Sequence, residues 1–464
     1  MKDTKRFFPI FAFYDRTGIE NYLEEKAGSG WMLEKIANFG WVFRRCEPKK
    51  VNFAVTYFPK ASAFDPEPTE EQLTFNEFCE HTGWIFAAQN AQMQIYYNES
   101  ENPTPIETDA LIELENIHKS AKKSHLPTYY IFLTNGILHA LTFFQRWVND
   151  PADVLTSNVN LFNGLCWILI LMMSLSEIGA YYSWRRKALR VAKDNGEFVR
   201  TSSCQGFQLF ILAVMLTGLS LMISSLHNAA LFGTLIAMLF GITAITILII
   251  FISNCLKKMK VSKSVNGFIT FGGSILLGII LSVSVVYIIA SGTGSLGHDP
   301  VSTYEFGIFE IEVYDDPIPL KIEDMQEVSY DRYSYELWHQ SSFLAEKYDC
   351  VQEPHISDSD EVPSLRYTVY EVKFSPVYNL MAEKIFEDIL DSYTNDGEII
   401  ASLIPVDPTD FLAKDAYRVY YRETEPMNRY LVFYPNNIII LRTDNELSSK
   451  DMNVIGQKLG ADIK

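Results

Sequence analysis

The chain has 464 residues, of which 48% are hydrophobic and 21% are charged, and its formal net charge at pH 7 is −18. The charge is uneven: residues 1–124 carry 14 Lys/Arg and 19 Asp/Glu, residues 125–292 carry 11 and 5, and residues 293–464 carry 14 and 33. The last segment is strongly acidic, and this argues against nucleic acid as its partner because the phosphates would be repelled. The length allows two or three domains.

Residues 1–124 are predicted to form an α+β domain. Strands are expected at 7–14, 31–36, 40–45 and 51–58, helices at 17–27 and 70–81, and a final hairpin at 84–88 and 93–97. Thr17 and Glu20 have the spacing of a helix capping box. Each helix is followed by a Gly-Trp pair, where the glycine suits a left-handed helix stop. The recurrence of this pair after both helices predicts two related helix–hairpin units.

Five stretches of residues 125–292 are apolar enough to cross a bilayer, which takes roughly 20 residues. They lie at about 126–148, 159–182, 207–226, 229–253 and 268–290. The first is the least apolar, because Asn135 and His139 interrupt it. A four-span arrangement would omit that stretch, and a soluble protein would have to bury all five as core helices.

Lys and Arg alternate between the loops that join these stretches. The segments before the first stretch, between the second and third, and between the fourth and fifth are basic, whereas 149–157 and 226–228 contain no Lys or Arg. The positive-inside rule therefore places the N-terminus in the cytoplasm and residues 293–464 outside the cell. A four-span arrangement would break this alternation. Residues 1–7 also lack the apolar core of a signal peptide.

Three polar residues inside the predicted spans are singled out: Asn135, His139 and Glu177. Polar groups in a bilayer are costly, so they are candidates for function. At 1.5 Å rise per residue, their depths allow Asn135 to hydrogen-bond Glu177. They are interpreted either as contacts that hold helices together, with Glu177 snorkelling to the inner interface, or as part of a proton or ion path.

A seam of small residues marks the fourth span, at a strict four-residue spacing: Ala229, Gly233, Ala237 and Gly241. Small residues on one helix face let two backbones approach closely. The seam serves either packing within the bundle or formation of a homodimer. The five spans contain no inverted repeat, which argues against a transporter.

Residues 293–464 are predicted to form a second α+β domain, an antiparallel sheet with helices on one side. Strands are expected at 306–313, 334–350, 365–374, 398–405 and 416–422, with a hairpin at 429–442 and helices at 376–393 and 449–459. The loop Asp358-Ser359-Asp360-Glu361 is either a calcium site or a solvated loop, and it lacks the glycine and the third acid at the spacing of an EF-hand-like site. The six cysteines show no zinc-site spacing, and no cofactor or catalytic motif occurs, which favours a protein that is not an enzyme.

Several N-terminal runs carry a family resemblance: Tyr14 to Leu23, Gly30 to Leu33, Phe43 to Lys50, Tyr57 to Lys60 and Phe78 to Trp84. Together they resemble the domain of unknown function 2812, a family of uncharacterised bacterial membrane proteins, mostly from Gram-positive species. The segments Asp315 to Leu320 and Glu425 to Tyr430 resemble parts of its longer members. The resemblance implies attached membrane spans and, from the PadR-like regulators associated with the family, a stress or regulatory setting. It implies no catalytic residues.

The sequence as a whole predicts a multi-domain membrane protein: a cytoplasmic α+β domain, a five-helix transmembrane bundle and an extracellular α+β domain. It would be a multi-pass protein of the plasma membrane without a cofactor. Its expected partners are the lipid bilayer, another protein and a second copy of itself, and no nucleic acid. The leading hypothesis is a sensor or regulatory protein, and the alternative is a transporter or transport-accessory protein that uses Asn135, His139 and Glu177.

Overall fold

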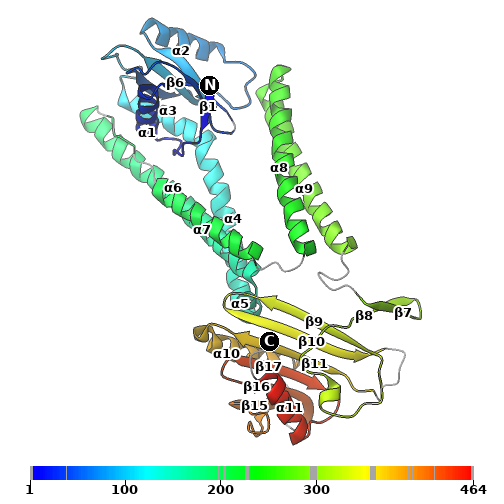
Figure 1. Cartoon of the computed structure of the whole chain (residues 1–464). Coiled ribbons are helices and arrows are strands. Elements are labelled where there is room, and N and C mark those ends of the chain that lie inside the picture. Colours follow the sequence, from blue (N-terminus) through cyan, green and yellow to red (C-terminus); the bar gives the residue numbers. More distant parts are fainter. Residues whose placement is uncertain are drawn as a thin grey trace. The chain divides into compact units, whose positions relative to one another are not determined.

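The computed structural model describes residues 4–37, 39–196, 198–201, 205–224, 229–292, 300–355, 362–395, 398–399, 401–422 and 424–460. The chain forms two compact units, whose elements are labelled in Figure 1. The first unit comprises residues 1–139, 166–217 and 233–292, and the second comprises residues 140–165, 218–232 and 293–464.

The N-terminal domain of the first unit consists of two βαββ repeats. The first repeat contains β1 (Thr4–Phe7), α1 (Arg16–Gly28), β2 (Trp31–Ile36) and β3 (Trp41–Arg45), and the second contains β4 (Asn52–Tyr57), α2 (Glu70–His81), β5 (Ile85–Asn90) and β6 (Met93–Asn98). Their antiparallel sheets have the same topology, β1-β3-β2 and β4-β6-β5. The predicted duplication is confirmed, and each repeat also includes the strand before its helix.

The stops of the two helices agree with the prediction, whereas the start of α1 does not. Gly30 and Gly83 have φ values of +81° and +83°, in the left-handed region that glycine tolerates. The helix begins with Asp15 as its N-cap, whose carboxylate accepts from the Gly18 amide at 3.1 Å, so the Thr17 capping box was wrong. The strand predicted at 7–14 was wrong except at Phe7, because β1 covers Thr4–Phe7 and Pro9, which has no amide hydrogen, follows two residues later.

Helix α1 also protects the free edge of β4. The Glu24 and Glu20 carboxylates accept hydrogen bonds from the backbone amides of Phe53 at 3.2 Å and Val55 at 2.9 Å. These amides point away from the sheet, because β4 is an edge strand. The contacts satisfy buried backbone donors and block pairing with another strand. Leu23 of α1 enters the core of the domain.

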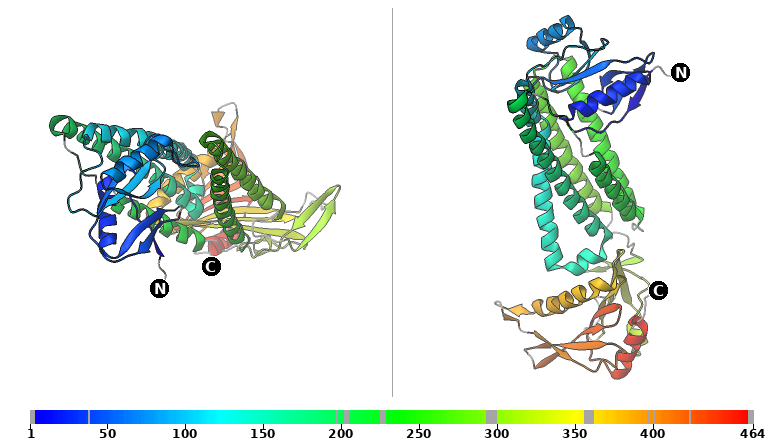
Figure 2. Two further views of the ribbon diagram at one scale, coloured as in Figure 1. Left: turned by 90° about the horizontal axis from the view of Figure 1, so that it is seen from above. Right: turned by 90° about the vertical axis from the view of Figure 1, so that its left-hand side faces the viewer.

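Long helices follow the N-terminal domain. They are α3 (Ala110–Lys123), α4 (His125–Asn149), α6 (Asn158–Asn195), α7 (Gln205–Ser224), α8 (Ala229–Lys258) and α9 (Lys263–Gly292). The five predicted spans lie in α4 and in α6 to α9, except that residues 225–226 of the third span lie outside the described residues. Helices α8 and α9 run side by side (Figure 1, Figure 2).

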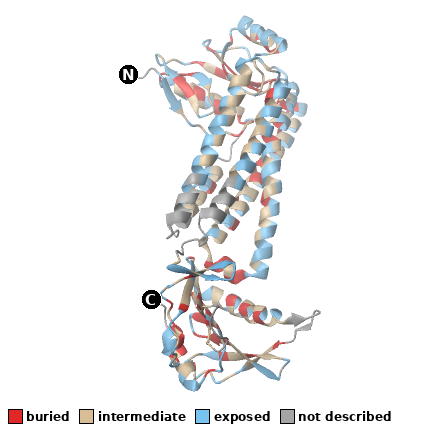
Figure 3. Ribbon diagram, turned by 90° about the vertical axis from the view of Figure 1, so that its right-hand side faces the viewer, coloured by how far each residue is buried: buried red, intermediate tan, exposed pale blue. Residues whose placement is uncertain are grey.

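Three helical segments of the described residues are long and apolar enough to cross a membrane: Asn158–Asp194, Met238–Lys258 and Lys263–Val283. The segment Gly206–Ser220 of α7 is apolar but shorter, and α4 is not among the three. Much of the surface of these helices is exposed in Figure 3. Phe240 and Phe268 expose 75% and 80% of their surface, which suits contact with lipid rather than with water. The finer prediction of five spans stays a prediction.

The second unit is built on a seven-stranded sheet with the order β14-β15-β16-β17-β11-β10-β9, in which every neighbouring pair is antiparallel. The strands are β9 (Tyr333–Ser341), β10 (Ala345–Pro354), β11 (Leu365–Val372), β14 (Ala401–Pro405), β15 (Asp415–Tyr421), β16 (Glu425–Phe433) and β17 (Asn437–Thr443). Short ribbons pair β7 (Ser302–Phe306) with β8 (Phe309–Val313) and β12 (Thr394–Asn395) with β13 (Glu398–Ile399). The helices are α5 (Pro151–Thr156), α10 (Tyr378–Asp391) and α11 (Ser449–Leu459).

Three predictions for this unit were wrong. The strand expected at 306–313 contains the turn between β7 and β8, at Gly307 and Ile308. The strand expected at 334–350 is a hairpin, with its turn at residues 342–344 between β9 and β10. The helices also cover both faces of the sheet rather than one. Ile438 packs with α10 and α5, whereas Ile439 packs with α11 on the other face. The apolar run of β17, Ile438 to Leu441, is typical of a strand buried on both sides.

Candidate functional site

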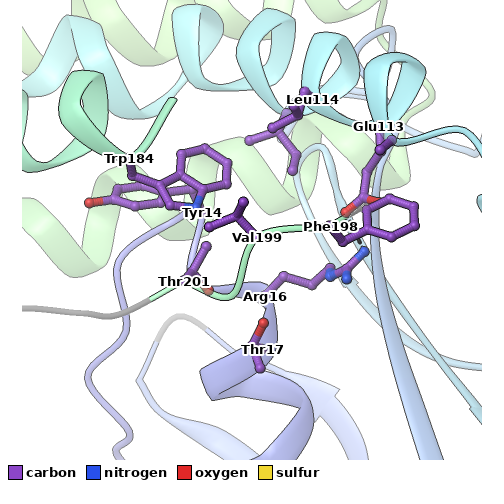
Figure 4. A pocket seen from close by; sticks show the side chains of 11 residues that line it. Tyr14, Arg16, Thr17, Glu113, Leu114, Trp184, Phe198, Val199 and Thr201 are labelled. Carbon is purple, nitrogen blue, oxygen red and sulfur yellow. Dashed lines mark hydrogen bonds and ion pairs between the residues drawn. The ribbon is translucent and has the colours of Figure 1, made fainter. Parts of the chain in front are cut away.

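The first unit contains a buried ion cluster centred on Arg16, the first residue of α1. Its guanidinium pairs with Glu20 one turn later, at 3.5 Å, and with Glu113 of α3, and both carboxylates are largely buried. The Phe198 ring covers the guanidinium at 5.2 Å, a cation–π contact that Figure 4 shows beside Glu113. One cation from the first repeat is thus held by α3 and by the connection between α6 and α7.

Burial sets the protonation of this cluster. It raises the pKa of Glu20 to about 7, against the opposing effect of Arg16. It raises the pKa of Glu113 to about 7 in the same way, and it also raises the pKa of Glu107. One guanidinium therefore faces three carboxyl groups that resist ionisation. The protonation of Glu20 and Glu113 therefore changes near neutral pH, and the charge of the cluster depends on pH.

The cavity beside Arg16 is too small for a substrate. It has a volume of about 20 Å³, which is room for about one water molecule. Glu113 and Trp184 line it, and the Glu113 Oε2 and Trp184 Nε1 atoms are buried without a hydrogen-bond partner in the described part of the chain. We therefore interpret the cluster as a tightly packed junction rather than a ligand pocket.

Helix α6 and the residues after it pack directly on this junction. Thr201 donates a hydrogen bond to Asp15 Oδ1 at 2.8 Å, so the residue that caps α1 also contacts the α6–α7 connection. Along α6, Ala188 and Ala192 are buried against Ala110 and Leu114 of α3. The small side chains of these alanines let the two helices approach closely.

An aromatic cluster joins the same elements nearby. Tyr14, just before α1, lies edge-on to Tyr181 and tilted against Trp184 of α6, with 5.1 Å between ring centroids in both pairs. The His125 ring, at the start of α4, contacts Tyr14 edge-on at 5.8 Å. The starts of α1 and α4 and the C-terminal part of α6 therefore meet at one aromatic junction.

The connection between α8 and α9 and the first turn of α9 also contact the N-terminal domain. Asn266 is fully buried, and its amide donates to the Phe64 carbonyl at 3.4 Å and to the Ser253 carbonyl at 3.3 Å. Lys260 pairs with Glu67 at 2.7 Å. Both basic connections of the predicted membrane region, the one after α6 and the one after α8, are thus packed on this domain.

The three predicted intramembrane residues make separate contacts. The Asn135 amide donates to the Ile131 carbonyl of its own helix at 2.8 Å. Glu177 accepts from Gln208 of α7 at 2.6 Å and is buried, so Gln208 has the role that the sequence assigned to Asn135. His139 stacks on Trp167 of α6, with 4.0 Å between ring centroids and 15° between the planes. The structure does not bring the three residues together as one polar path.

The predicted small-residue seam is described at one position. The side chains of Ala229, Gly233 and Ala237 lie outside the described residues. A Cβ atom on Gly241 would lie 2.8 Å from Leu281 Cδ1, so this glycine lets α9 pack closely against α8.

The candidate calcium loop at 358–361 also lies outside the described residues. Within the described ranges, no group of three or more His, Cys, Asp or Glu residues is placed to hold a metal ion.

Sequence reasoning missed the Arg16 cluster. Arg16 and Glu20 have ordinary i, i+4 spacing, which does not predict burial. Glu113 gave the stronger signal, because it lies at i+3 from Ala110 and i−4 from Ile117, on the apolar face of its helix. An acid on such a face predicts a buried partner, but nothing in the sequence identifies that partner as Arg16.

The fold and its junction define a class of protein: a duplicated βαββ domain attached to apolar helices long enough to cross a membrane. Residues 15–128 match the family described as "Protein of unknown function (DUF2812)", so the N-terminal domain is a DUF2812 domain, as its resemblance predicted. The match includes Arg16, Glu20 and Glu113. No match was found among curated proteins or solved structures.

Proposed function

We propose that this is a multi-pass protein of the bacterial plasma membrane that transmits a signal from an outer domain to its cytoplasmic DUF2812 domain. The observation that carries the proposal is the packing at the two ends of α6. Its C-terminal part packs on the Arg16 junction of the first unit. At its other end, Asn158 Oδ1 accepts from the Phe343 amide at 3.2 Å in the β9–β10 turn of the second unit.

Helix α5, which directly precedes α6, strengthens this connection. Ala152 and Leu155 are buried in the same cluster as Met381 and Ile385 of α10. The Ser342 hydroxyl donates to the Leu155 carbonyl. A displacement of the acidic domain would therefore act on α5 and α6, and through α6 on the DUF2812 domain.

The loop charges support the proposed orientation, with five spans, the N-terminus inside and residues 293–464 outside. The two basic connections pack on the N-terminal domain, and the connection without Lys or Arg, which contains α5, packs on the C-terminal domain. The positive-inside rule places the basic connections in the cytoplasm.

Protease treatment of intact cells tests the orientation. The protease should digest the C-terminal domain and leave a membrane-bound fragment that contains the DUF2812 domain. Antibody tags at the two ends would identify the fragments, and permeabilised cells would serve as the control. Loss of the N-terminal tag from intact cells would refute the orientation.

Hydrogen–deuterium exchange on the full chain in nanodiscs tests the coupling. Ala152→Glu should release α5 from α10 and change exchange in peptides that cover 14–20 and 198–201. Ile308→Glu, at a 92% exposed position of the β7–β8 turn, is the matched control. If Ala152→Glu changes exchange only in the second unit, the two domains are not coupled through α6.

The proposed role is regulatory rather than catalytic, and it needs no cofactor. The transport alternative gains no support from Asn135, His139 and Glu177, because each of them makes a packing contact within or between helices. The proposed partners are the bilayer and a cytoplasmic protein that recognises the DUF2812 domain, and a second copy of the chain remains part of the proposal.

A further inference from the structure

Three arginines lie directly opposite one another on adjacent strands of the second unit. Arg366 of β11 is the register partner of Arg442 of β17, and Arg442 is also the partner of Arg429 of β16. Side chains two residues apart share a face, so Arg442 lies on the face of Ile438, which packs with α10. Like charges directly opposite on neighbouring strands destabilise a sheet. Three in a row thus carry a cost that the fold alone does not explain.

The surrounding acids do not remove this cost, although residues 293–464 carry 33 Asp/Glu against 14 Lys/Arg. Arg366 pairs with Glu353. Arg429 instead contacts Tyr393, with 3.2 Å between its Nη1 and the phenol oxygen and 5.6 Å from guanidinium to ring centroid. Arg442 is exposed and has no carboxylate within ion-pair distance in the described part of the chain.

The arginines line a surface hollow of about 290 Å³, close to the lower size limit of small-molecule sites. Asp349 and Thr368 line it as well. The Asp349 carboxylate is already engaged, because Lys347 pairs with Oδ2 at 2.8 Å and the Thr368 hydroxyl donates to Oδ1 at 2.7 Å. The hollow is therefore electropositive on a strongly acidic domain.

We propose that this hollow, lined by Arg366, Arg429 and Arg442, binds the phosphoryl group of a small ligand. Guanidinium groups present forked N–H donors that match phosphate oxygens, and a dianion would relieve the repulsion among three cations. The phosphoryl group belongs either to a soluble phosphorylated compound or to a lipid headgroup. Such a ligand would be the signal in the proposed function. Binding at this hollow does not require that function, and only the step from binding to signalling rests on it.

Binding is measured on the full chain in a maltoside detergent, which carries no phosphate. Calorimetric titration with glycerol 3-phosphate tests the soluble source. Flotation with phosphatidylcholine vesicles, with and without phosphatidic acid, tests the lipid source. Arg442→Gln and Arg429→Gln should each weaken binding about tenfold or more, as expected for loss of a charged hydrogen-bonding group. Arg422→Gln, at an exposed arginine in the β15–β16 turn, should bind like the wild type.

Thermal unfolding without ligand separates a binding role from a structural one. Because Arg442 is repelled by both neighbours, Arg442→Gln should raise the unfolding temperature and reduce the further rise that the ligand causes. Failure of both glycerol 3-phosphate and phosphatidic acid to bind, or equal binding by the wild type and both variants, would overturn the proposal. Binding without any change in the exchange of the DUF2812 domain would support the site and count against the proposed signalling.

Discussion

Arg16 joins three parts of the chain that are far apart in the sequence. Its guanidinium contacts Glu20 in its own helix, Glu113 in α3 and the Phe198 ring in the α6–α7 connection. A buried ion pair is a weak source of net stability, because the cost of removing both charges from water offsets their attraction. Removing one partner is a different matter, since it leaves the other charge buried alone. The cluster therefore makes the position of Phe198 sensitive to the charge of its neighbours.

Arg16→Met should destabilise the first unit by about 3 kcal/mol, because the buried Glu20 and Glu113 lose their cation. The change is measured by thermal unfolding of the full chain in detergent, with exchange at 198–201 as a local readout. Arg44→Met, at an exposed arginine of β3, is the control and should have little effect. An Arg16→Met variant as stable as the wild type would show that the carboxyl groups are already neutral.

The stability of the first unit should fall as pH rises through about 7. The pKa values of Glu20 and Glu113 are about 7 in the fold, against 4.5 as the ordinary value. A raised pKa gives stability that is fully present below 4.5 and is lost as the pH passes the folded value. Glu113→Gln should therefore flatten the dependence of the unfolding temperature on pH between 5 and 8. Equal slopes for the variant and the wild type would contradict this account.

In both βαββ repeats, the turn from helix to strand depends on a glycine at the end of the helix. Gly30 and Gly83 turn the chain from helix to strand at positive φ, and a tryptophan begins the extended segment in each case. A Cβ on Gly30 would also approach the Cys46 carbonyl oxygen to 3.0 Å. The turn therefore needs glycine both for its backbone conformation and for the nearby chain.

Gly30→Ala should destabilise the N-terminal domain by about 1–2 kcal/mol, the cost of a left-handed conformation for a residue with a Cβ. Gly28 offers a control two residues earlier: it lies in α1, and an added Cβ meets nothing within 4 Å. Gly28→Ala should stabilise the helix by about 0.5–1 kcal/mol. Thermal unfolding of both variants measures the contrast, and a loss of similar size in both would refute it.

At the scale of the whole molecule, the long helices of residues 125–292 expose many large apolar side chains, and small residues mark where these helices contact other elements. Ala188 and Ala192 of α6 contact α3, and Gly241 of α8 contacts α9. The proposed signalling depends on the first of these contacts, because it fixes α6 to the DUF2812 domain.

Ala192→Glu should separate α6 from α3 and destabilise the first unit by roughly 2–3 kcal/mol, because it buries a charge without a partner. Lys193→Glu introduces the same side chain at the adjacent exposed position and should be almost neutral. Unfolding temperature and exchange at 198–201 report the effect. If both variants behave alike, the α6–α3 contact is not a structural connection.

The sequence by itself determined the features that depend on local residue patterns. Glycines after two helices predicted the duplication, and the spacing of apolar runs predicted helices at all five stretches. Short strand and helix signals also predicted an α+β domain on either side of them. These signals are local, because backbone conformation and the burial of an apolar face act within a few turns of chain. The run Ile438 to Leu441 even carried the signal for a strand buried on both faces, although the prediction covered one face only.

Only the tertiary structure decided which distant groups meet. Glu113 lies 97 residues from Arg16, and no periodicity connects them. Asp15 replaced Thr17 as the cap of α1, and Gln208 replaced Asn135 as the partner of Glu177, because several polar side chains were within reach and packing selected one. The arginine row depends on strand register, since a shift of one residue would move Arg442 to the opposite face. The Arg16 junction and the arginine row therefore both arise from long-range pairing.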